Sequence, residues 1–92
     1  MFTAQHERLE FNMREFIRTE LETGITFASL ALDSRTEEKR QRTRENARKA
    51  YDTALHFWTD RAFGKLPAPH DLLALRVTLR HLLLQLGETL EK

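Results

Sequence analysis

Apolar and small residues recur every three or four positions through the first third of the chain. They are Leu9, Met13, Ile17, Leu21, Gly24, Ala28 and Ala31. This spacing keeps all of them on one face of an α-helix, where they can be buried together. Because the stripe passes through Gly24 without losing phase, it predicts a single helix over about residues 4–32. A break near Thr23-Gly24 is the alternative, since glycine inside a helix costs about 1 kcal/mol.

A second stripe of the same kind follows a short polar segment. Ser34 and Glu37 have the S-x-x-E spacing of a capping box, in which both side chains bind free backbone N–H groups at a helix start. The buried face then consists of Thr43, Ala47, Tyr51, Ala54, Trp58 and Ala62. Gly64 suits a left-handed residue after the last turn. We therefore predict a second helix over about residues 35–63.

The two predicted helices are nearly equal in length and are separated by two or three residues. This arrangement predicts an antiparallel helical hairpin. Folding the chain at residues 33/34 places Gly24 against Thr43 and Leu9 against Trp58. Large side chains then lie at the open end of the hairpin and small ones near the turn. The two stripes agree in this respect, which supports the pairing.

A third helix is predicted after the segment LPAP, because Pro69 and Asp71 suit a first helical turn. Its leucine stripe comprises Leu72, Leu75, Leu79, Leu82 or Leu83, Leu86 and Leu90. This helix, about residues 70–88, is too short to reach the turn of the hairpin, so Gly24 and Thr43 should lie beyond it. With three glycines, two prolines and no period-two segment, the chain reads as one all-α domain, residues 1–92. The predicted fold is a three-helix bundle, a long hairpin plus a shorter third helix.

The predicted third helix carries a second apolar stripe. Leu73, Val77 and Leu84 lie roughly 100–180° around the helix from the main leucine face. A helix that is apolar on two sides is usually buried on two sides, and a three-helix chain provides only one. The stripe therefore predicts a homodimer or a protein partner; the alternative is that these residues cap the same core in a splayed bundle. Phe11, opposite the Leu9–Met13 face, is a further exposed apolar candidate.

The run KRQRTR gives the chain a local charge asymmetry. Residues 34–49 carry 7 basic and 3 acidic side chains, a net of +4, whereas residues 1–33 carry 3 and 6, a net of −3. Clustered cations attract polyanions, so nucleic-acid association is the alternative function. A solvated helix face is the competing interpretation, because acid–base pairs at i,i+4 spacing recur here. The possible polyanion contacts are Lys39, Arg40, Arg42 and Arg44.

The sequence lacks the usual patterns of catalytic and metal sites. It has no cysteine, no two of its four histidines stand at i,i+4 spacing, and it contains neither a Gly-rich phosphate loop nor G-x-S-x-G. We therefore expect a non-enzyme without metal or cofactor. No apolar run approaches the roughly 18 residues of a membrane span. Because MFTAQHERLE does not resemble a signal peptide, the cytoplasm is the expected compartment.

Two short segments resemble known families. ARKAYDTALHFW resembles the second helix of a tetratricopeptide repeat at Ala47, Tyr51 and Ala54, and the resemblance implies packing roles for these three residues. RVTLRH resembles the R-x4-H motif of HEPN-domain ribonucleases, which implies action of Arg76 and His81 on an RNA 2′-hydroxyl and phosphate. The chain as a whole resembles short bacterial helical-hairpin proteins, and that resemblance implies no activity.

Overall fold

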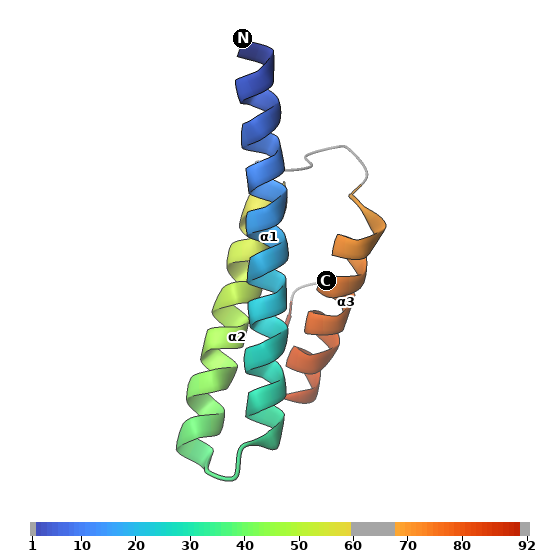
Figure 1. Ribbon diagram of the computed structural model, residues 1–92. Helices are drawn as coiled ribbons and strands as arrows, with labels where there is room; N and C mark the ends of the chain where they lie inside the picture. Colours follow the sequence, from blue (N-terminus) through green and yellow to red (C-terminus); the bar gives the residue numbers. More distant parts are fainter. Residues whose placement is uncertain (1, 60–67, 91–92) are drawn as a thin grey trace.

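The computed structural model describes residues 2–59 and 68–90, with side chains described from Met13 onward. It contains helices α1 (Phe2–Asp33), α2 (Glu37–Phe57) and α3 (His70–Gln85), and the described residues include no strand. Helix α1 packs chiefly against α2, and α3 packs chiefly against α1 (Figure 1). The predicted fold class, an all-α bundle of a long hairpin and a shorter third helix, is confirmed.

Helix α1 runs without interruption for 32 residues, so the prediction of a single helix is confirmed. Gly24 lies inside it at a point where all three helices meet. A methyl group placed on Gly24 would lie 2.6 Å from Cδ2 of Leu79 and 3.3 Å from Cβ of Ala50. A side chain at this position would force the end of Leu79 to move and Ala50 to give way slightly, so the limited space between the helices, and not backbone flexibility, favours glycine here.

The same contacts correct two predictions about the hairpin. Gly24 faces Ala50 of α2, so its predicted pairing with Thr43 is wrong. Helix α3 reaches Gly24 through Leu79, so the prediction that no third helix arrives there is also wrong. The pairing between the two helices is therefore displaced from the predicted register. Part of this displacement arises because α1 ends later and α2 begins later than predicted, so each α1 residue faces a higher-numbered residue of α2.

The predicted capping box at the start of α2 is wrong. The Ser34 hydroxyl donates to the carbonyl oxygen of Leu30 at 2.8 Å, and its N–H donates to that of Ala31 at 3.2 Å. Ser34 therefore completes the C-terminal end of α1. Thr36 is the cap of α2, and its hydroxyl oxygen accepts from the N–H of Lys39 at 3.3 Å. The turn consequently occupies residues 34–36.

The core changes in side-chain size along the hairpin, as predicted. Near the turn the buried residues are small, namely Ala28, Ala31, Thr43 and Ala47. Farther from the turn the hairpin contributes the large residues Ile17, Leu21, Tyr51 and Trp58 beside the small Ala50 and Ala54, and α3 contributes Leu72, Leu79 and Leu83. The buried hydroxyl of Thr43 donates to the carbonyl oxygen of Lys39 at 2.8 Å, which satisfies it within its own helix.

Helix α3 ends earlier than the predicted residue 88. Its C-cap is Leu86, and Gly87 adopts a left-handed backbone with φ of 89°. The N–H of Gly87 donates to the carbonyl oxygen of Leu84 and the N–H of Glu88 to that of Leu83, both at 3.0 Å. This pair of bonds is a Schellman motif, which stops the helix and turns the chain. The predicted end of the second helix at residue 63, with Gly64 after it, lies outside the described residues.

Candidate functional site

An exposed apolar stripe runs along the outer side of α3. The side chains of Leu73, Val77 and Leu84 are 40%, 51% and 46% exposed. At 3.6 residues per turn, the three positions fall within about 40° of one another around the helix. They do not belong to the core cluster, to which α3 contributes Leu72, Leu79 and Leu83 from a different face. These three side chains therefore lie outside the core, and no other described residue buries them in this single chain.

The predicted apolar candidate on α1, Phe11, has a side chain outside the described residues. Another aromatic residue, Phe16, is 40% exposed. Its ring packs edge-to-face on Phe57 of α2, with centroids 5.3 Å apart and an angle of 86° between the planes. Sequence periodicity gave no indication of this pair, because Phe16 lies beside the buried stripe of α1 and meets its partner only after the hairpin has formed.

The four predicted polyanion contacts are placed in different environments. Lys39 and Arg42 are exposed, and Arg40 is half-buried. Arg44 is turned toward the end of α3, where its Nη1 donates to the carbonyl oxygen of Leu86 at 3.3 Å. Its Nε also lies 3.2 Å from Oε2 of Glu88. One of the four cations is therefore engaged within the fold.

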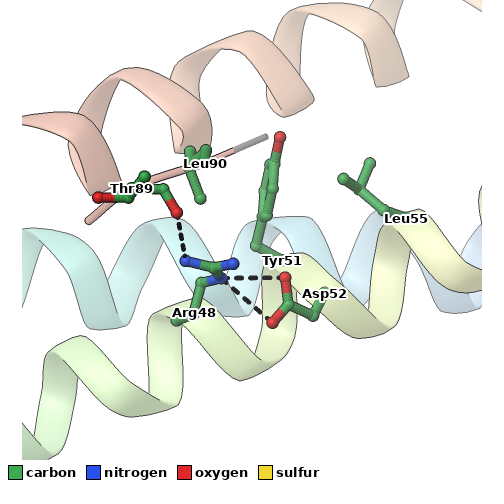
Figure 2. Close-up of a pocket in the computed structure, with 6 residues that line it drawn as sticks. All are labelled: Arg48, Tyr51, Asp52, Leu55, Thr89 and Leu90. Carbon is green, nitrogen blue, oxygen red and sulfur yellow. Dashed lines mark hydrogen bonds and ion pairs between the residues drawn. The ribbon is translucent and has the colours of Figure 1, made fainter. Parts of the chain in front are cut away.

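One turn further along α2, Arg48 makes a larger set of contacts (Figure 2). Its Nη1 donates to the carbonyl oxygen of Thr89 at 3.0 Å. The same Nη1 donates to Oε1 of Glu88 at 3.1 Å. Its Nε lies 3.0 and 3.1 Å from the two carboxylate oxygens of Asp52. The hydrogen bond to Asp52, followed by that to Glu88, raises the pKa of Arg48. We refer to Arg44, Arg48, Glu88 and the carbonyl groups of Leu86 and Thr89 as the C-terminal clamp.

The clamp has a simple electrostatic basis. The last turn of a helix exposes carbonyl groups and carries a partial negative charge, which cations stabilise. Helix α3 has no basic residue in its own last turn, and two arginines of α2 lie there instead. Because Gly87 reverses the chain, Glu88 also reaches the same arginines. Sequence reasoning missed the contact of Arg48 with the end of α3, since Glu88 and Thr89 are 40 and 41 positions away.

A pocket of about 350 Å³ lies beside the clamp, between α2 and the residues that follow α3. Tyr51 stands between Leu55 and Leu90, and Arg48, Asp52 and Thr89 complete the lining (Figure 2). The charged groups of the pocket, Arg48 and Asp52, bind each other. The pocket is therefore a small recess of mixed polar and apolar lining, with an ion pair at its edge. The described residues contain no group of three or more histidines and acids that could hold a metal ion.

The structure does not bring Arg76 and His81 together. The guanidinium carbon of Arg76 lies 5.0 Å from the centroid of a Trp58 ring, a cation–π contact between α3 and the end of α2. His81 is exposed. Five positions along a helix correspond to a rotation of roughly 140°, so the two side chains leave α3 in different directions. In this fold Arg76 joins two helices.

A second ion pair fixes the beginning of α3. Arg18 of α1 donates to the carboxylate of Asp71, whose other oxygen accepts from the N–H of Leu72 at 2.9 Å. The bond from Arg18 lowers the pKa of Asp71 and raises that of Arg18. Both ends of α3 are thus held by arginines of the hairpin, from α1 at the start and from α2 at the end.

Comparison with known proteins gives no relative. No family model matches the sequence, and no match was found among curated proteins or solved structures. Within the part of the chain that the structure describes, no helix is long and apolar enough to cross a membrane. Ala47, Tyr51 and Ala54, which carry the tetratricopeptide-like pattern, are buried, as packing residues of any helical hairpin would be.

The C-terminal clamp should contribute measurably to stability. We expect Arg48→Met to lower the free energy of unfolding by about 1–3 kcal/mol, because it removes hydrogen bonds to Glu88 and a carbonyl group but keeps an apolar stem. Arg42→Met, at an exposed position of the same helix, is the matched control and should change stability by less than about 0.5 kcal/mol. Urea denaturation followed by circular dichroism measures both. Equal effects of the two substitutions would contradict a structural role for the clamp.

Proposed function

We propose that this protein is a non-enzymatic helical module for protein–protein interaction, which forms a homodimer through the outer side of α3. The observation that carries the proposal is the row of three large apolar side chains, Leu73, Val77 and Leu84, each at least 40% exposed on one helix face. Contiguous exposed apolar surface of this kind is typical of interaction sites. Its burial by a second copy would contribute roughly 25 cal/mol for each Å² removed from water.

The dimensions of α3 predict the strength of the association. The helix has 16 residues and is therefore roughly 24 Å long. One helix of this length buries less than the roughly 800 Å² per partner that is usual for stable complexes. We therefore expect a dimer that dissociates in the micromolar range and whose population depends on protein concentration.

Size-exclusion chromatography with light scattering tests the proposal. At about 100 μM, a concentration above micromolar dissociation constants, wild-type protein should have the mass of a dimer. Leu73→Glu/Leu84→Glu should have the mass of a monomer, because each dimer would bury four unpaired carboxylates. Its circular dichroism spectrum should match the wild type, since neither leucine belongs to the core cluster.

The matched control is Leu30→Glu/Leu32→Glu, which makes the same change at two exposed leucines of α1. This variant should remain dimeric. A wild-type protein that is monomeric at this concentration would refute the homodimer. A dimer that survives in the α3 variant would assign association to another surface.

A further inference from the structure

We propose that two copies associate with their α3 helices antiparallel, so that Leu73 of each chain contacts Leu84 of its partner. This inference rests on the proposed function and adds the orientation of the second copy. The alternative is a parallel pair of α3 helices, which would also cover the exposed stripe. In that pair every residue meets its own counterpart in the partner chain.

The stripe is nearly symmetric about its own midpoint. Leu73 and Leu84 stand eleven positions apart, which is about 16 Å along the helix. The midpoint lies between Thr78 and Leu79. A two-fold axis through it exchanges the positions of the two leucines, so each leucine meets the other in the partner chain. An isologous interface requires this kind of self-complementary surface.

Arg80 favours the antiparallel orientation. It lies on the same side of α3 as the stripe, between Val77 and Leu84, and is half-buried. In a parallel pair the two copies of Arg80 would face each other, and like charges would meet at an apolar contact. In the antiparallel pair Arg80 faces the partner's Val77, where its methylene groups cover the valine and its guanidinium extends into water.

The charge distribution along the molecule favours the same orientation. Residues 34–49, at the turn end of the hairpin, carry a net +4, partly offset by Glu88 and Asp52, whereas residues 7–22, toward the open end, carry five acidic and three basic side chains, a net of −2. Antiparallel pairing brings each basic end toward the acidic half of the partner. Parallel pairing places the two basic ends together. Helix dipoles also attract when neighbouring helices are antiparallel.

The absence of cysteine from the chain makes disulfide mapping unambiguous. Leu73→Cys and Leu84→Cys are prepared as separate variants and oxidised alone and as a mixture, with Ser29→Cys as an exposed control on α1. A disulfide requires Cα atoms within about 7 Å. In the antiparallel dimer, two Cys at position 73 are about 16 Å apart along the axis. Covalent dimer should therefore form only in the mixture, and mass spectrometry should identify the 73–84 linkage.

A second measurement leaves the stripe intact. A nitroxide attached at Arg35→Cys, in the turn of the hairpin, reports the separation of the two turns by electron–electron double resonance. Antiparallel pairing places the turns at opposite ends of the dimer and gives the longer distance. Parallel pairing places them at the same end and gives the shorter one.

Each outcome decides between the two proposals. Covalent dimer in the mixture alone, together with the long spin–spin distance, supports the antiparallel pair. Covalent dimer from each single variant, or the short distance, overturns the orientation but preserves the homodimer. A wild-type protein that remains monomeric by light scattering overturns the homodimer and the orientation with it. A dimer without cross-linking above the Ser29→Cys control, and with a spin–spin distance that fits neither arrangement, overturns the use of α3.

Discussion

Leu79→Ala should lower the free energy of unfolding by about 2–5 kcal/mol, the usual cost of truncating a buried leucine. Leu79 is fully buried and lies over Gly24, where all three helices meet. Because α1 has no side chain at that position, no neighbouring group of α1 can move in to fill the space. The total stability of a domain of this size is on the order of 5–14 kcal/mol, so the loss is a large fraction of it.

Urea denaturation at low micromolar concentration measures this effect in the monomer. The matched control is Leu84→Ala, which makes the same substitution on the same helix at an exposed position. We expect the control to cost less than about 0.5 kcal/mol under these conditions. If the two variants lose equal stability, Leu79 does not have the central packing role described above.

Gly24→Leu should be at least as harmful, with an expected loss of about 3 kcal/mol or more. Even a single methyl group at Gly24 would overlap Leu79 and press on Ala50, so a leucine can enter only if α3 moves away from the hairpin. The substitution improves helix propensity by about 1 kcal/mol, and the expected loss exceeds this gain. Thermal and urea denaturation give the free energy, and amide exchange of α3 reports its displacement.

Two further variants separate packing from propensity at Gly24. Ser29→Leu places the same side chain at an exposed position of α1 and should be tolerated. Gly24→Ala combined with Leu79→Ala should lose less stability than the sum of the two single changes, because the new methyl group then occupies part of the space left by the leucine. Additive losses would show that the two residues are not in contact.

Much of the fold follows from helical periodicity. The stripe through Gly24 predicted an uninterrupted α1, and the second stripe predicted α2. Both helix predictions hold because the spacing of apolar residues along one helix face is a local property of the sequence. The number of leucines on α3 likewise predicted exposed apolar residues, because it can be read from the sequence of that helix alone. A helix with more apolar surface than its neighbours can cover must leave some of it exposed.

The errors lie where two local patterns compete. Ser34 and Thr36 both suit an N-cap, and the choice depends on where α1 ends, which is determined by packing. At the end of α3, Leu90 continues the leucine spacing and favoured a longer helix. Gly87 interrupts it, because its left-handed backbone closes a Schellman motif. A rule that gave glycine more weight than periodicity near the end of a leucine stripe would have found this boundary.

The contacts of Arg44 and Arg48 with the end of α3 could not be predicted from spacing, unlike the i,i+4 pair of Arg48 and Asp52. Their partner Glu88 is at least 40 positions away, and the register that unites them depends on the close approach of α3 at Gly24. The Phe16–Phe57 contact has the same origin. Long-range pairs of this kind are set by helix packing, and a single sequence contains no periodic pattern that marks them.

The C-terminal clamp also changes the electrostatic field that α2 presents to an approaching polyanion. Of the seven basic side chains in residues 34–49, Arg44 and Arg48 face Glu88 and Asp52, and both acids lie outside that range. The net charge of the segment therefore overstates the attraction at its surface by about a factor of two. A nucleic acid meeting this helix would therefore encounter chiefly the five cations outside the clamp, namely Arg35, Lys39, Arg40, Arg42 and Lys49.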